Sequence, residues 1–201
     1  MKKFNFIPTR AAGLERLKIF LPSAGKDYAA SRNYDLGHNN RTNVSMLSPY
    51  IRHRSLTEIE VLKSVLCYHS KKSSEKFIQE VFWRTYWKGW LEMRPTVWAD
   101  YHSKLNRLAD DLKTQSGFRK SWENACQGKT GIDCFDSWAK ELFDTGYLHN
   151  HARMWFASIW IHTLELPWEL GADFFLRNLL DGDPASNTLG WRWVGGAQTV
   201  G

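Results

Sequence analysis

The feature that most constrains the fold is a succession of helix start and stop signals, without the alternation of apolar and polar residues that marks β-strands. Thr57 and Glu60 form a capping-box pair, which predicts a helix that runs to about His69. Ser73 or Ser74 can cap the next helix, EKFIQEVFWRTYWKGWLEM, which is expected to end before the following proline.

Further helices are expected along the rest of the chain. They cover residues near 11–20, 98–113 and 117–125, then from Asp133 or Asp136 to Phe143, and finally 150–163 and 169–180. Gly146 is expected to end the helix that starts at Asp133 or Asp136, and Pro167 to separate the helix over 150–163 from the one over 169–180. The remainder of residues 1–50 is expected to form loops, most clearly at 31–43. We therefore predict a single all-α domain over residues 1–201.

Composition agrees with one globular domain. The 201 residues are 43% hydrophobic, enough for a full core. The net charge of +6 and a pI of about 9.2 favour a polyanionic partner. The three cysteines form no CxxC pair, so reduced thiols are expected. The start of the chain, MKKFNFIPTR, has no apolar run typical of a signal peptide, and no long apolar stretch predicts a membrane span. We expect a cytoplasmic protein without a membrane partner.

Two familiar kinds of site are rejected. The GKTG stretch at 128–131 resembles part of a phosphate-binding loop, but Glu123 occupies the position where that loop needs its first glycine. His149, His151 and His162 lack the spacing of metal ligands, so no metal is proposed.

A polar face is expected on the helix around residue 80. Glu80, Trp83, Arg84 and Trp87 follow one another at i, i+3, i+4 and i+7, which places them on one face. A carboxylate and a guanidinium between indoles suit a polar ligand in a cavity. The alternative is an ion pair between Glu80 and Arg84 beside core tryptophans.

A second polar group is expected at Asn150, Arg153 and Met154, which occupy adjacent positions of one helix surface. Arg153 can pair with Asp181, from the stretch DGDPASNTLGWRW at 181–193. Such a pair would orient the polar edge of a ligand, or it would be an ordinary salt bridge between a helix and a loop.

Five segments, in this order, resemble the FAD-binding helical domain of the DNA photolyase and cryptochrome family. They are SMLSPYIR, EVFWRTYW, GKTGIDCFD, TGYLHNHARM and DGDPASNTLGWRW. The resemblance covers the chain from about Tyr28 onward and implies FAD as the cofactor. It also implies that the N-terminal α/β antenna domain of the family is absent and that the chain stops early, as a truncated sequence or a small member. The DGDPASNTLGWRW stretch is expected to be the loop that closes over the flavin ring.

The resemblance assigns cofactor roles by matching positions. Tyr28, Ser45, Ser48 and Arg84 match residues on the FAD phosphates and ribityl chain. Arg153 and Asp181 match an ion pair beside the flavin ring, Asp183 an acid at its polar edge, and Asn187 the residue that faces flavin N5. Asn150 is counted among the cofactor contacts as well.

It assigns substrate and electron-transfer roles in the same way. Trp83 and Trp193 match indoles that sandwich a flipped-out thymine dimer, and Glu80, Asn150 and Met154 match its polar and apolar contacts. Relatives that repair (6-4) photoproducts carry histidine at the positions of Asn150 and Met154. Trp191 and Trp168 match the first two members of an electron-transfer chain whose third position is Gln115 here, with Trp122 nearby in sequence.

The resemblance implies a deoxyribodipyrimidine photolyase that splits cyclobutane pyrimidine dimers by light-driven electron transfer. We expect a monomer that binds UV-damaged DNA, single- or double-stranded. A cryptochrome-like photoreceptor without repair activity is the alternative, and a fragment that binds flavin weakly is a third possibility.

Overall fold

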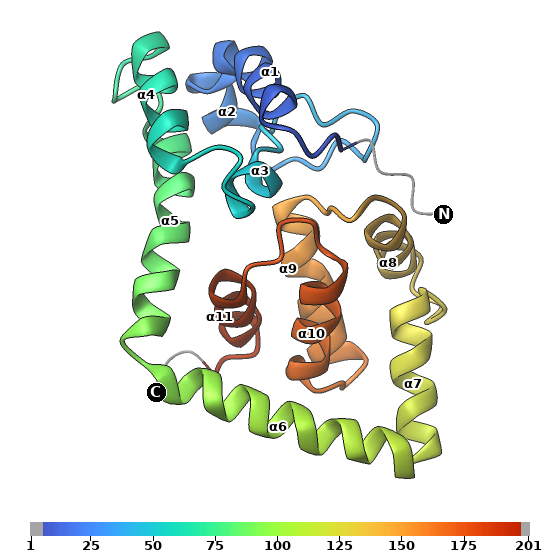
Figure 1. Cartoon of the computed structure of the whole chain (residues 1–201). Coiled ribbons are helices and arrows are strands. Elements are labelled where there is room, and N and C mark those ends of the chain that lie inside the picture. The colour runs from blue at the N-terminus through green and yellow to red at the C-terminus, as the bar shows by residue number, and fades with distance from the viewer. Residues whose placement is uncertain (1–5, 198–201) are drawn as a thin grey trace. The chain divides into compact units, whose positions relative to one another are not determined.

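The computed structural model describes residues 6–197, and this part of the chain consists of helices and loops with no strand (Figure 1). The fold class is therefore all-α, as predicted. By their internal contacts the described residues divide into an N-terminal unit, which ends at Tyr86, and a C-terminal unit, which begins at Trp87. Helix α5 (Glu75–Glu92) runs through this boundary. None of the helices between residues 6 and 197 is both long and apolar enough to cross a membrane.

The N-terminal unit surrounds one small core. Its elements are α1 (Arg10–Phe20), the 3₁₀ turn η1 (Leu21–Ser23), α2 (Lys26–Ser31), α3 (Ser48–Arg52), α4 (Glu58–Tyr68) and the first part of α5. The capping box of α4 is confirmed, because Glu60 N donates to Thr57 Oγ1 over 3.2 Å and Thr57 N donates to Glu60 Oε2 over 2.9 Å. The expectation that residues 1–50 hold a single helix was wrong. The two extra helices, α2 and α3, are too short to show a hydrophobic period.

The C-terminal unit packs six helices around a larger core. They are α6 (Pro95–Thr114), α7 (Ser116–Gln127), α8 (Asp133–Thr145), α9 (Asn150–Ser158), α10 (Trp168–Asn178) and α11 (Pro184–Val194). Helices α9, α10 and α11 lie side by side, and α6, α7 and α8 follow one another around them (Figure 1). Helix α6 begins at Pro95 rather than near residue 98, because proline is well suited to the first turn.

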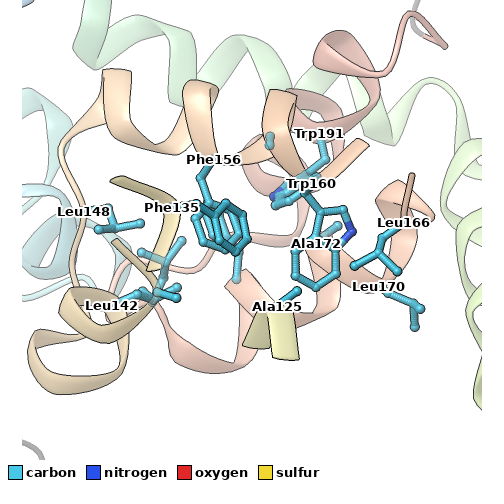
Figure 2. Close-up of a cluster of buried hydrophobic side chains, with 14 of the residues drawn as sticks. Ala125, Phe135, Leu142, Leu148, Phe156, Trp160, Leu166, Leu170, Ala172 and Trp191 are labelled. Atoms are coloured by element: carbon cyan, nitrogen blue, oxygen red, sulfur yellow. The ribbon is translucent and has the colours of Figure 1, made fainter. Parts of the chain in front are cut away.

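Aromatic rings fill the centre of the C-terminal unit. The rings of Phe135 and Phe156 stack with their centres 4.1 Å apart, beside the fully buried Trp160 (Figure 2). The expected helix over 150–163 continues from α9 into a π-helical turn, η2 (Ile159–Thr163). Trp160 Nε1 donates to the Pro167 carbonyl over 3.0 Å, which joins the start of this turn to the residue before α10.

The expectation that 181–193 forms a loop was wrong for most of its length, because helix α11 begins at Pro184. Asp183 Oδ1 accepts hydrogen bonds from Ala185 N over 3.1 Å and Ser186 N over 3.0 Å. A capping aspartate followed by proline is a strong helix start. Only the DGD part of the stretch stays irregular, and the residues after it are held on a rigid element.

The GKTG stretch connects α7 to α8. Gly128 adopts a left-handed conformation with φ 61° and ends α7. Asp136 accepts hydrogen bonds from Thr130 N over 2.9 Å and Gly131 N over 3.0 Å, which closes the loop onto α8. Partial burial alone would raise the pKa of Asp136, but these bonds outweigh it and lower the pKa below its ordinary value.

Candidate cofactor and lesion-binding residues

Arg153 and Asp181 form the ion pair that the sequence predicted. Arg153 Nη2 donates to Asp181 Oδ2 over 2.9 Å, and Arg153 Nε donates to the Leu148 carbonyl over 3.0 Å. The guanidinium carbon also lies 5.2 Å from the centre of the Tyr147 ring, a cation–π contact. These three contacts fix the plane of the guanidinium and join α9 to the irregular segment before α11.

The pair keeps its charge in a partly buried place. Burial alone would lower the pKa of Arg153, but the charge and hydrogen bond of Asp181 outweigh it, so the pKa lies above its ordinary value. The two segments are also joined through the backbone, where Leu180 N donates to the Gly146 carbonyl over 2.8 Å. The arginine is thus a fixed cation, as the orientation of a ligand edge requires.

The two carboxylate oxygens of Asp183 make different contacts. Oδ1 caps α11, and Oδ2 lies 3.6 Å from Nζ of Lys88. The aspartate is only 4% exposed, so the lysine offsets part of the cost of burying its charge. A cavity of about 370 Å³ opens beside this pair, lined by Lys88, Leu91, Trp98, Asp183 and Pro184 among others. Its volume is within the range of pockets for small ligands.

One side of α11 carries polar groups and open space around Gly190. Asn187 Nδ2 donates to the Ala172 carbonyl over 2.8 Å, so its amide oxygen is the atom left to accept from a ligand. The buried hydroxyl of Ser186 has no hydrogen-bond partner among the described residues. A Cβ built on Gly190 meets no atom within 4 Å. Trp193, one turn further on, is 57% exposed.

Of the two tryptophans expected to carry electrons, Trp191 is buried in the core of the C-terminal unit, and Trp168 is partly buried and packs against that core. Trp191 is 3% exposed, and its ring centre is 5.0 Å from that of Phe175. Trp168 begins α10 and stacks on Tyr101 with ring centres 5.6 Å apart. Gln115, at the expected third position, lies between α6 and α7. Electron transfer along these residues stays a prediction.

Two of the expected lesion contacts begin α9. Asn150 is the first residue of the helix and is exposed, and its Nδ2 lies 4.0 Å from Sδ of Met154 one turn later. The sequence therefore placed both side chains on one helix face correctly. Their contact with a lesion stays a prediction.

The polar face of α5 carries charges that pair with other segments, and not with each other as in the alternative interpretation of a Glu80–Arg84 ion pair. Glu80 forms its ion pair with Arg32 of the N-terminal unit. Arg84 Nε lies 3.9 Å from Oε1 of Glu58. Trp83, between them in sequence, is 46% exposed. Each charge is thus held by a partner far away in sequence, and an indole stays accessible to a ligand.

The remaining expected cofactor residues lie in or near the core of the N-terminal unit. Tyr28 is buried on α2, and its ring packs edge-on against Phe77 with centres 5.2 Å apart. Ser45 Oγ accepts a hydrogen bond from Leu47 N over 3.3 Å, and Ser48 is the first residue of α3. The structure leaves the FAD roles of these three residues as predictions.

Sequence reasoning missed three residues that hold the expected ones in place. Lys88 forms an ion pair with Asp183, and Arg32 forms one with Glu80. The ring of Tyr147 makes a cation–π contact with the guanidinium of Arg153. Lys88 follows Arg84 by four residues on α5, so the period that identified the polar face would have included it. The pairing of Arg32 with Glu80 has no signal in the local sequence.

The C-terminal unit fits the flavin cofactor that the resemblance implied. Gly190 leaves room for a flat ring against α11, and the Ser186 hydroxyl lacks the partner that a polar ring would supply. The amide oxygen of Asn187 can accept from a ring N–H group.

Comparisons with known proteins identify the family. The family model of the FAD binding domain of DNA photolyase matches residues 77–200, more than half of the chain. A deoxyribodipyrimidine photo-lyase of Streptomyces griseus is 31% identical over 170 residues, which cover 83% of this chain and 36% of the relative. One from Escherichia coli K12 is 25% identical over 201 residues, covering 97% and 41% respectively. The chain thus spans less than half the length of these relatives.

Solved structures show the same fold. A bacterial class III photolyase from Agrobacterium tumefaciens has a TM-score of 0.76 and 26% identity, covering 94% of this chain and 38% of its own. A Synechocystis cryptochrome has a TM-score of 0.77 at 24% identity, covering 100% and 41% respectively. The chain therefore belongs to the photolyase and cryptochrome family, corresponds to its helical FAD-binding domain, and has FAD as its cofactor.

Proposed function

We propose that this chain is a deoxyribodipyrimidine photolyase that splits cyclobutane pyrimidine dimers in UV-damaged DNA by light-driven electron transfer. The relatives named deoxyribodipyrimidine photo-lyase support the proposal. The observation that carries it is the contrast on α11 between the buried Trp191 and the 57% exposed Trp193. A large indole left in solvent next to a polar helix face suits the stacking of a flipped-out base.

Four polar side chains are proposed to hold the phosphates and ribityl chain of FAD. Tyr28, Ser45, Ser48 and Arg84 would bind the phosphates and ribityl chain, where hydroxyl and guanidinium donors suit negative charge. The chemistry that FAD supplies when bound is light absorption and the donation of one electron to the dimer.

Around the ring we assign three further roles. The fixed ion pair of Arg153 and Asp181 would orient its polar edge, because three contacts hold the guanidinium in one plane. Asp183 would occupy the same edge, held by its bonds to α11 and its contact with Lys88. Asn187 would present its amide oxygen to N5, since its nitrogen is already bonded to Ala172.

The lesion is proposed to contact two exposed indoles and three further side chains. Trp83 and Trp193 would each offer a flat apolar surface, and both are about half exposed as such a role requires. Glu80, Asn150 and Met154 would complete the contacts, with Glu80 held in place by Arg32. Asn150 and Met154 stand where the relatives that repair (6-4) photoproducts have histidine, which favours cyclobutane dimers as the substrate.

Trp191 and Trp168 are proposed to carry electrons to FAD during photoreduction. Trp191 is buried in the core of the C-terminal unit, and Trp168 is partly buried and packs against that core. We further propose that the protein acts as a cytoplasmic monomer and binds DNA through phosphate contacts, so that its affinity falls as salt rises. The net charge of +6 supports phosphate binding.

The experiment that tests the function is a repair assay. The chain, purified with FAD and chemically reduced, is mixed with an oligonucleotide that carries one thymine dimer, and dimer loss is followed under blue light and in the dark. We expect loss only in the light. A chain that binds FAD but leaves the dimer intact in both conditions would contradict the proposed repair activity and favour a photoreceptor.

A further inference from the structure

Two glycines in helices of the C-terminal unit have very different surroundings, as a Cβ built at each position shows. On α10, a Cβ at Gly171 would collide with the ring of Trp191, at 2.3 Å from Cη2. On α11, a Cβ at Gly190 meets nothing within 4 Å. The first glycine is explained by packing inside the unit. The second has no such explanation, although glycine in a helix interior is less favourable than alanine.

Open space alone does not mark a site, because Gly89 on α5 is equally free. The difference lies in the surroundings of Gly190. Ser186 and Asn187 precede it by four and three residues, so they flank it on the same helix face. The Ser186 hydroxyl is buried without a partner among residues 6–197, and the Asn187 amide is fixed with its nitrogen on Ala172.

The missing Cβ of Gly190, the unpaired hydroxyl and the fixed amide each match a property of a ligand. The missing Cβ allows a flat group to approach the helix backbone closely. The hydroxyl of Ser186 needs a hydrogen-bond partner, and the fixed amide of Asn187 offers an acceptor. A planar ring with polar atoms along its edge meets all three requirements, whereas an aliphatic side chain of a neighbouring protein would leave the hydroxyl unpaired.

We propose that Gly190 and Ser186 are two further residues of the flavin site, with the isoalloxazine ring lying against the backbone of α11 at Gly190 and its polar edge bonded to Ser186. The proposal rests on the FAD site proposed above and extends it to two residues of the DGDPASNTLGWRW stretch to which the resemblance assigned no role. Gly190 then determines which ligands fit, because any side chain there occupies the space of the ring.

The test is a pair of matched substitutions, Gly190→Ala and Gly89→Ala, with FAD affinity measured by quenching of flavin fluorescence on titration of the apoprotein. Gly89 is a suitable control because it lies nine residues from Glu80, which places it on the opposite side of α5. Both variants should keep the circular dichroism and the melting temperature of the parent or raise the latter slightly, because alanine favours helix and neither Cβ meets a neighbour.

We expect Gly190→Ala to weaken FAD binding at least about tenfold, as a steric clash in a fitted site does, and Gly89→Ala to leave it unchanged. Gly190→Leu, which projects further into the same open space, should abolish binding while the helix content persists. Ser186→Ala should weaken binding by about three- to tenfold, the effect of one lost hydrogen bond. Parent-like affinity in Gly190→Ala and Gly190→Leu would overturn the proposal, as would a parent chain that binds no FAD.

These outcomes differ from those of the repair assay. If the parent binds FAD, the Gly190 variants lose it, and no dimer is split in the light, then the ring site stands and the repair function fails. If repair occurs and the Gly190 variants bind FAD like the parent, the function stands and the ring lies elsewhere.

Discussion

The indole of Trp191 lies directly against Gly171, so close that a Cβ on the glycine would come within 2.3 Å of the ring carbon Cη2. This contact joins α10 to α11 at a point where neither helix has room to move. Because Trp191 is only 3% exposed and packed among other rings, it has no free space into which it can turn. The register of the two helices therefore depends on the absence of one methyl group.

Substitution Gly171→Ala should destabilise the protein by about 1–3 kcal/mol, the usual range for an overfilled core. The measurement is the free energy of unfolding from denaturant titration, read by tryptophan fluorescence. Gly117→Ala is the matched control, since its Cβ meets nothing within 4 Å near the start of α7. Equal stability of the two variants would show that α10 and α11 can move apart without cost.

Removal of one member of the Arg153–Asp181 ion pair should lower the stability of the fold for an electrostatic reason. Arg153→Ala would remove the guanidinium that contacts the carboxylate of Asp181, which is 5% exposed. We expect the variant to lose about 3 kcal/mol of stability, the lower end for a broken buried ion pair. In the double variant Arg153→Met with Asp181→Asn, part of that stability should return, because neither position then carries a charge. Its FAD affinity should stay low if the pair orients the ring, so a double variant with parent affinity would contradict that role.

Acid should weaken the contact between α1 and the start of α4. The hydrogen bond from Arg10, followed by those from Thr57, lowers the pKa of Glu60 from 4.5 to about 2. A carboxylate whose pKa is lower in the folded state stabilises the fold above its ordinary pKa, and this contribution is lost as the pH falls from about 4.5 towards 2. Glu60→Gln should therefore show a smaller loss of stability over this range, measured as denaturant midpoints at several pH values. Glu123→Gln, on the surface of α7 beside Arg119, serves as the control.

The sequence predicted most of the long helices because their ends carry clear chemical signals. The capping box of Thr57 and Glu60 and the left-handed Gly146 appear where expected. Asp183 followed by Pro184 is an equally clear start, and the helix after it could have been predicted on that ground. It was missed because the helices assigned from local signals ended at residue 180, and the segment after them was then interpreted as a loop.

The partners of the charged side chains could not be predicted from helical spacing. The i, i+4 relation of Glu80 and Arg84 suggested a local pair, yet Glu80 bonds to Arg32 and Arg84 lies near Glu58. The two partners lie elsewhere in the chain, Arg32 just after α2 and Glu58 at the start of α4, and which side chain reaches a given charge depends on how these elements pack. Arg153 and Asp181 were paired correctly although 28 residues separate them, because the match of positions to the family, rather than helical spacing, supported this pair.

The two tryptophans near the end of α11 should separate stability from DNA binding. Trp193→Ala removes a side chain that is 57% exposed, so the fold should change little, while affinity for an oligonucleotide with a thymine dimer should fall by about 1–3 kcal/mol, the range for one lost stacking contact. Trp191→Ala removes a buried ring and should cost about 3–5 kcal/mol of stability instead. Fluorescence anisotropy with damaged and undamaged oligonucleotides measures the first effect, and thermal unfolding the second. If Trp193→Ala binds both oligonucleotides as the parent does, the exposed indole is no lesion contact, and the proposed substrate face of α11 would have to be abandoned.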